Sequence, residues 1–218
     1  MKPLLHIAFD TYTIQQTIQL LHSGIADAAD VVECGGPLIF NEGVRAITAI
    51  KKEYPQKEIV ADIKMIPLLT TFNAQQFFDA GADSMIIFGT ASLRDMTAAM
   101  RVAENAKKKF YVFVDLEPDT FPSQELLALY QKAGVKHVIY HTVRKSAPYW
   151  MDSDVKCVRM LLDAGFHVSV TGKLTPETIR LFAGMPLYSF ILGTSVVEAA
   201  DPIAVLEQYR VFLDQNFS

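Results

Sequence analysis

Short apolar runs recur along the chain at nearly even spacing, and amphipathic segments with helical periodicity lie between them. The eight runs cover residues 4–9, 31–34, 59–63, 85–88, 110–114, 138–140, 168–170 and 190–192. Runs of this length, rich in β-branched residues, are typical of buried parallel strands. Eight such strands alternating with eight helices predict a (β/α)8 TIM barrel, for which 218 residues are enough.

Helix signals fill the segments between these runs. Residues 43–53, 123–133 and 154–164 carry apolar side chains at helical spacing. The capping signals are the candidate N-caps Ser92 and Ser123, the first-turn prolines Pro176 and Pro202, and the Ala-Gly pairs at 80–81, 133–134 and 164–165. With no linker or low-complexity stretch, we expect one barrel domain over residues 1–218.

A doubly wound open sheet is the alternative architecture, because it also alternates strands with helices. Open sheets that bind dinucleotides carry Gly-x-Gly-x-x-Gly after the first strand, whereas residues 10–15 here read Asp-Thr-Tyr-Thr-Ile-Gln. The missing motif argues against dinucleotide binding, and the number of strands favours the closed barrel.

Composition excludes several classes of partner. The net charge of -4 provides no basic surface for nucleic acid or for an anionic membrane. No apolar stretch is long enough to span a bilayer, and the first residues lack a signal-peptide pattern. Cys34 and Cys157 are not spaced as a metal or redox motif, so we expect reduced, core-packed thiols in a cytoplasmic protein.

Polar residues follow the predicted strands, whereas the strand bodies are apolar. Asp62 and Lys64 lie two positions apart near the end of the third strand, so they share one face of it. The other strand ends carry, in chain order, Asp10, Glu33, Gly89, Asp115, His141, Thr171 with Gly172, and Gly193 with Thr194. A closed barrel brings all these ends to one mouth, where barrel active sites lie.

The residue types predict the chemistry of this mouth. Glu33 and Asp62 are hard oxygen ligands suited to Mg²⁺, and Lys64 can stabilise a developing enolate oxygen. His141 is a candidate general acid or base near neutral pH. The loops after strands seven and eight lie where many barrels bind phosphate. The predicted substrate is a sugar phosphate or similar anion, and the predicted reaction proceeds through a metal-bound enediolate.

Each of these residues also has a structural interpretation. Asp10 can cap the first helix, Glu33 can form an ion pair with Lys64, and His141 can be a hydrogen-bonded core histidine. The convergence of so many polar groups on one mouth favours a binding or catalytic site over these separate structural roles.

Six short segments carry a resemblance to a known family. They are Ile7-Ala8-Phe9-Asp10, Val32-Glu33-Cys34-Gly35, Asn41-Glu42-Gly43-Val44-Arg45-Ala46-Ile47, Ala61-Asp62-Ile63-Lys64, Tyr140-His141-Thr142-Val143-Arg144 and Val170-Thr171-Gly172. Over nearly its whole length the chain resembles 3-keto-L-gulonate 6-phosphate decarboxylase and hexulose-6-phosphate synthase, of the orotidine 5'-monophosphate decarboxylase suprafamily.

The resemblance implies a (β/α)8 barrel homodimer with sites near the subunit interface. It implies Mg²⁺ on Glu33 and Asp62, with Lys64 beside the enediolate. It also implies that His141 and Arg144 deliver a proton through water, and the presence of both residues points to the decarboxylase branch.

The remaining substrate contacts are also assigned by resemblance. Asp10 and Asp115 would bind the sugar. The loops Thr171-Gly172-Lys173 and Gly193-Thr194 would bind its phosphate.

Three departures from the family pattern stand out. Pro67 replaces the last acid of Asp-x-Lys-x-x-Asp, which in the family reaches into the partner subunit's site. Asp115 stands where the decarboxylases usually have Glu. Lys173 replaces a glycine after strand seven, and Thr194 replaces an arginine after strand eight. We therefore expect a modified phosphate site in which Lys173 supplies the charge.

The leading functional hypothesis is a Mg²⁺-dependent decarboxylase of a phosphorylated keto sugar acid, with a role in L-ascorbate catabolism. One alternative is an aldolase-type hexulose-6-phosphate synthase. The other is a non-catalytic homologue that binds a sugar phosphate, a hypothesis that rests on Pro67. The loss of an acid at this position predicts intact ligand binding with reduced turnover on the family's usual substrates.

Overall fold

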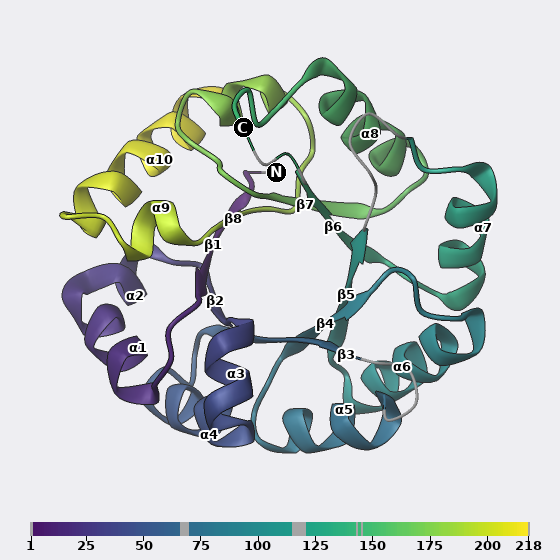
Figure 1. Cartoon of the computed structure of the whole chain (residues 1–218), viewed down its shortest axis with the longest axis horizontal. Helices are drawn as coiled ribbons and strands as arrows, with labels where there is room; N and C mark the ends of the chain where they lie inside the picture. Colours follow the sequence, from purple (N-terminus) through teal and green to yellow (C-terminus); the bar gives the residue numbers. More distant parts are fainter. Residues whose placement is uncertain (1, 66–69, 115–120, 143, 145, 218) are drawn as a thin grey trace.

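The computed structural model describes residues 2–65, 70–114, 121–142, 144 and 146–217. Its eight parallel strands form a closed barrel in chain order, and β1 pairs with β8 to complete the ring (Figure 1). The strands are β1 (Leu4–Phe9), β2 (Val31–Cys34), β3 (Glu58–Met65), β4 (Ser84–Phe88), β5 (Lys109–Val114), β6 (His137–His141), β7 (His167–Thr171) and β8 (Ser189–Leu192). The predicted (β/α)8 TIM barrel is confirmed, and the open-sheet alternative is wrong.

Helices cover the outside of the barrel (Figure 1). They are α1 (Ile14–Leu20), α2 (Ala26–Ala28), α3 (Gly36–Glu42), α4 (Val44–Glu53), α5 (Thr70–Asp79), α6 (Leu93–Ala106), α7 (Gln124–Ala133), α8 (Asp152–Asp163), α9 (Thr194–Val197) and α10 (Pro202–Asn216). No helix within the described ranges combines the length and apolar character needed to cross a membrane.

The helices do not alternate singly with the strands as expected. Two helices follow β2, and two follow β8. A π-helical turn, Leu21–Ile25, joins α1 to α2. After β7 the chain forms only a 3-10 helix, Thr178–Phe182, so Pro176 precedes this element instead of lying in the first turn of an α-helix.

The predicted N-caps are confirmed. Ser92 and Ser123 each precede a helix, α6 and α7 respectively, and their side chains accept hydrogen bonds from the backbone N–H groups of Asp95 and Leu126. Each bond satisfies a donor that the first turn of a helix leaves without a partner. These caps fix the residues at which α6 and α7 begin.

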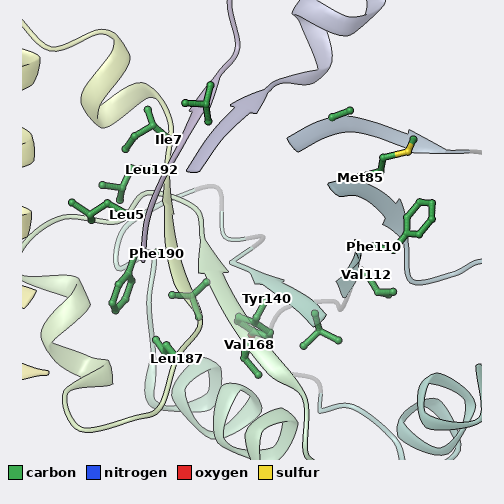
Figure 2. Packing of buried hydrophobic residues seen from close by; sticks show 14 of the residues in the cluster. Leu5, Ile7, Met85, Phe110, Val112, Tyr140, Val168, Leu187, Phe190 and Leu192 are labelled. Atoms are coloured by element: carbon green, nitrogen blue, oxygen red, sulfur yellow. The ribbon is translucent and has the colours of Figure 1, made fainter. Parts of the chain in front are cut away.

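Apolar side chains pack in two places. The larger cluster fills the space between the barrel and the helices, and Leu5, Phe110 and Phe190 belong to it (Figure 2). The smaller cluster lies inside the barrel and takes one residue from each of seven strands: Ala8, Val31, Val60, Ile86, Tyr111, Ile139 and Ile191. We call this second group the interior apolar ring. The two clusters reflect the alternation of side chains along each strand.

Polar side chains occupy the barrel end where the strands begin. Glu58 accepts hydrogen bonds from Lys109 at 2.8 Å and from the Tyr111 hydroxyl at 2.9 Å. The ring centroid of His137 lies 5.3 Å from that of Tyr111 and 4.8 Å from that of His167. We call these five residues the base network. Tyr111 belongs to both groups, and the rest of the interior apolar ring lies between the other base-network residues and the strand ends at the opposite mouth.

Candidate active site

The carboxyl ends of the strands surround two adjoining cavities, an inner one of about 250 Å³ and an outer one of about 670 Å³. Predicted site residues around the inner cavity are Asp10, Glu33, Asp62, Lys64, His141, Thr171 and Gly193. Those around the outer cavity are Asp10, His141, Arg144, Thr171, Gly172, Lys173, Gly193 and Thr194. The shared residues show that the cavities form one mouth. Asp115 and Pro67 lie outside the described residues.

Three carboxylates meet at the inner cavity. Glu33 on β2 and Asp62 on β3 are each only 5% exposed. Burial and the negative charge of Glu33 raise the pKa of Asp62 to about 6, against the opposing charge of Lys64. The same causes raise the pKa of Asp10. Crowded, desolvated acids of this kind are characteristic of sites that bind a cation or handle protons.

Lys64 is held over the acids by an unusual backbone conformation. Its φ angle is 39°, in a region that side chains other than glycine rarely adopt. The pairing of β3 with β4 shifts register between Asp62 and Met65, so the strand is irregular at this point. The Lys64 ammonium forms an ion pair with Asp62 and lies 5.7 Å from the centroid of the Phe113 ring. Conformational strain of this kind gathers at functional sites.

The structural interpretation of Glu33 predicted an ion pair with Lys64, but the structure does not form that pair. Its Oε2 lies 2.8 Å from Nε2 of His6, a residue of β1 with no exposed surface. The two atoms are within ion-pair distance but lack hydrogen-bond geometry. Sequence reasoning missed His6 because it lies within an apolar run. The signal that could have found it is its even spacing from Asp10, because side chains an even number of positions apart in extended chain point to the same side.

The acids present oxygen atoms that suit a metal ion. Oε2 of Glu33 and Oδ1 of Asp62 are buried, and neither accepts a hydrogen bond from any described residue. Buried oxygens without donors are costly, and a cation would satisfy them. The described residues include no group of three or more His, Cys, Asp or Glu arranged around a metal position. Two carboxylates are nevertheless a fitting set for Mg²⁺, which retains several waters.

His141 ends β6 and faces both cavities. Its ring lies 5.5 Å from that of Phe113, measured between centroids. A Cβ built on Gly172 would lie 3.2 Å from Nε2 of His141 and 2.8 Å from Cγ2 of Thr142, and the φ of Gly172 is +100°. The glycine therefore provides both the turn and the room for the imidazole at the cavity wall.

Arg144 lies at the rim of the outer cavity and contacts the first turn of α8. Its Nε is 3.3 Å from Oδ2 of Asp154, and its Nη2 donates to Ser153 at 3.3 Å. Asp154 is buried and was not predicted as a site residue, because site residues were expected at the strand ends and Asp154 lies at the start of a helix.

The loops after β6 and β7 are joined at the rim of the outer cavity. The indole N–H of Trp150 donates to the carbonyl of Gly172 at 2.8 Å, and Thr142 donates to the carbonyl of Tyr149 at 2.5 Å. Lys173 follows Gly172, is exposed, and has a φ of 48°. This arrangement presents one lysine to the outer cavity from a turn that the neighbouring loop supports.

The β7 and β8 ends complete the wall of the outer cavity. The Thr171 hydroxyl donates to the carbonyl of Ile191 at 3.1 Å, which fixes it to the neighbouring strand. Gly193 and Thr194 begin α9 directly after β8. The outer cavity therefore combines backbone, hydroxyl and ammonium groups, which together suit an anion.

Sequence comparison supplies an independent finding. Residues 3–209 match the orotidine 5'-phosphate decarboxylase / HUMPS family. A probable 3-keto-L-gulonate-6-phosphate decarboxylase of Mycoplasma pneumoniae is 34% identical over 211 residues, which are 95% of both chains. A 3-keto-L-gulonate-6-phosphate decarboxylase of Escherichia coli is 31% identical over 211 residues, with the same coverage.

Solved structures agree with this match. A ligand complex of KGPDC from Streptococcus mutans superposes with a TM-score of 0.92 at 26% identity, and the match covers 100% of each chain. 3-Hexulose-6-phosphate synthase from Salmonella typhimurium has a TM-score of 0.84 at 26% identity and covers 98% of this chain and 99% of its own.

Proposed function

The chain belongs to the orotidine 5'-phosphate decarboxylase / HUMPS family, and we propose that it is a Mg²⁺-dependent decarboxylase of a phosphorylated keto sugar acid of the 3-keto-L-gulonate 6-phosphate type. One observation carries the proposal. A lysine at the barrel mouth forms an ion pair with the buried Asp62, and neither Oδ1 of Asp62 nor Oε2 of the buried Glu33 accepts a hydrogen bond from a described residue. The names of the sequence relatives support the same reaction class.

The two cavities suit the two ends of such a substrate. The phosphate would lie in the outer cavity, against Gly172, Lys173 and Thr194. The carbons that react would then reach the inner cavity, where Glu33 and Lys64 lie. Binding of the phosphate thereby places the opposite end of the sugar at the acids, which is the positioning that makes a reaction effectively unimolecular.

Decarboxylation breaks the bond between the carboxylate carbon and its neighbour, and the electron pair moves onto the adjacent carbonyl oxygen. The Lys64 ammonium would donate a hydrogen bond to that oxygen and stabilise its negative charge. The ion pair with Asp62 holds the Lys64 ammonium at the inner cavity, where this role needs it. Glu33 and Asp62 would hold Mg²⁺, which supplies further positive charge at the reacting oxygens when bound.

The carbon that loses CO2 must then gain a proton. His141 faces both cavities, and Arg144 faces the outer one. We propose that these two side chains hold the water that supplies the proton, with His141 restoring it. Asp10, which also faces both cavities, would accept hydrogen bonds from sugar hydroxyls.

We further propose that the chain acts as a homodimer. Phe40 on α3 is 89% exposed, and Tyr12 is 65% exposed. The side-chain amide of Asn41 donates to the carbonyl of Tyr12 at 3.3 Å, which places the two aromatic residues on neighbouring segments near the mouth. Exposed aromatic side chains of this size favour burial in an interface. Light scattering on the purified protein tests the dimer, and a monomer at micromolar concentration would contradict it.

A hexulose-6-phosphate synthase, which is an aldolase-type lyase, is the second candidate. It is favoured by the close superposition with the Salmonella typhimurium synthase. A non-catalytic sugar-phosphate-binding protein is the third candidate, because Pro67 stands at a position where the family pattern has an aspartate. If the first candidate is correct, we expect the protein to be cytoplasmic and to act in L-ascorbate catabolism.

One assay distinguishes these functions. CO2 release from 3-keto-L-gulonate 6-phosphate is measured with Mg²⁺ and with EDTA, beside formaldehyde release from 3-hexulose 6-phosphate. The proposal expects Mg²⁺-dependent CO2 release as the faster reaction. Faster formaldehyde release would favour the synthase, and binding of both sugars without either product would favour the non-catalytic protein.

A further inference from the structure

One buried carboxylate on α8 connects three parts of the site wall. Oδ1 of Asp154 accepts a hydrogen bond from the Tyr140 hydroxyl at 2.8 Å. Oδ2 accepts one from the backbone N–H of Met151 at 2.7 Å and lies 3.3 Å from Nε of Arg144. The side chain is only 4% exposed, so these protein donors substitute for water.

Capping of α8 does not account for this arrangement. As the N3 residue of a capping box, Asp154 needs only the contact with the Met151 N–H, and capping boxes accept a neutral Gln at N3 as well as an acid. A buried ionised carboxylate costs far more to desolvate than a neutral acceptor, and a cation must compensate it. Among the residues that the structure describes, Arg144 is a cation that lies beside Asp154.

The two side chains that contact Asp154 flank His141 in the sequence. Tyr140 is the preceding residue on β6, and Arg144 lies three residues beyond His141. Burial and the hydrogen bond to Asp154 raise the pKa of Tyr140, so its hydroxyl stays a donor. One carboxylate thus fixes both the end of β6 and the guanidinium at the outer cavity.

We propose that Asp154 is a positioning residue that holds Arg144 in its working orientation at the rim of the outer cavity. The role assigned to Arg144 rests on the proposed function, whereas its orientation by Asp154 does not. Asp154 itself does not contact the substrate. It acts on turnover through Arg144, and the hydrogen bond from Tyr140 holds its own carboxylate in place.

A double-mutant cycle tests whether Asp154 acts through Arg144. Asp154→Asn keeps the volume and an acceptor for the helix cap but removes the charge. We expect it to lower kcat for CO2 release roughly tenfold, with KM changed much less. In an Arg144→Ala background the same substitution is expected to have almost no further effect. Equal effects in both backgrounds would overturn the proposal, because a purely structural cap acts independently of Arg144.

Asp152→Asn is the matched control. Asp152 lies in the same first turn of α8 and is exposed, so the substitution removes the same charge from the same helix end. We expect it to leave kcat unchanged. A loss equal to that of Asp154→Asn would assign the effect to the helix terminus and contradict the proposal.

A spectroscopic measurement gives an answer that does not depend on activity. The Nε–H of Arg144 has its own ¹⁵N–¹H resonance. This resonance is assigned as the one that disappears from the spectrum of the Arg144→Lys variant. We expect this proton to exchange with water far more slowly than that of Arg45, whose side chain is 76% exposed, and its resonance to move in Asp154→Asn. Exchange as fast as that of Arg45 in the wild type would overturn the proposal, even if Asp154→Asn failed to fold. A protected proton in a protein without decarboxylase activity would instead refute only the proposed function.

Discussion

The carboxylate of Asp10 occupies the space that a side chain on Gly35 would need. A Cβ built on Gly35 would overlap Oδ1 of Asp10 and would lie 2.8 Å from the carbonyl oxygen of Phe9. The Gly35 N–H also donates to that carbonyl at 3.1 Å, so the two strand ends are fixed against each other. The glycine after β2 therefore makes room for the acid after β1.

Gly35→Ala is expected to displace Asp10 and to weaken sugar binding. Loss of a hydrogen bond to a charged group costs about 1.5–3 kcal/mol, which is roughly ten- to a hundredfold in Kd. Calorimetric titration with a pentose 5-phosphate measures this. Gly36→Ala is the control, because its nearest contact is the Asp62 carbonyl at 4.0 Å. Unchanged affinity in Gly35→Ala would show that Asp10 does not bind the ligand.

Mg²⁺ is expected to raise the melting temperature relative to EDTA, because a metal that binds only the native state stabilises it by mass action. At a concentration of about a hundred times Kd the stabilisation is about 2.7 kcal/mol, or several degrees for a chain of this size. Asp62→Asn should abolish the difference, whereas Glu58→Gln at the opposite end of the barrel should preserve it. An Asp62→Asn protein that responds to Mg²⁺ like the wild type would contradict the metal assignment.

Acid is expected to destabilise the fold through His137. Burial, with the nearby charges of His167 and Lys109, lowers the pKa of His137 to about 4. Between pH 6.5 and 4 the unfolded chain therefore binds more protons than the folded chain, and stability falls as the pH falls. The loss is at most about 3 kcal/mol. Urea unfolding should show a shallower pH dependence in His137→Gln, and identical slopes in the two proteins would exclude His137 as the cause.

Lys173→Ala is expected to weaken binding of phosphorylated ligands much more than binding of their unphosphorylated analogues. A contact between a lysine and a phosphate is worth about 1.5–3 kcal/mol, or roughly ten- to a hundredfold in Kd. Lys52→Ala, which removes an exposed lysine from α4, is the control. Equal weakening of both ligand classes would remove Lys173 from the phosphate site.

Ligand binding is expected to change the intrinsic fluorescence of the protein. The chain has one tryptophan, and its indole N–H donates to the carbonyl of Gly172 at the wall of the outer cavity. A phosphate bound beside Gly172 changes the field at the indole, so the emission should shift with a midpoint equal to the calorimetric Kd. Saturating phosphorylated ligand without any spectral change would argue that it binds away from this loop.

The strand framework could be predicted because buried parallel strands are continuous apolar runs, which periodicity detects directly. The convergence of Asp10, Glu33 and His141 followed from the same argument, since closure of the barrel brings the strand ends together. Both predictions depend on chain order and not on side-chain geometry.

Partner choice could not be predicted in the same way. Glu33 contacts His6 and not Lys64, whereas the pairing of Lys64 with Asp62 agrees with the strand face that they were predicted to share. The positive φ of Lys64 at an irregular point of β3 was not predicted. Such local geometry depends on tertiary packing. Asp154 was missed for a different reason, since it lies at the start of a helix and site residues were expected at the strand ends.

The interior apolar ring has a consequence for how this protein can diversify. It places mainly apolar side chains between the charges at the mouth and those of the base network, so substitutions at the two ends that leave Tyr111 and His6 unchanged should combine additively. Ligand specificity at the strand ends and tolerance to acid at the base are therefore expected to respond to separate sets of substitutions. Chimaeras that join the mouth of one relative to the base of another offer a direct route to such combinations.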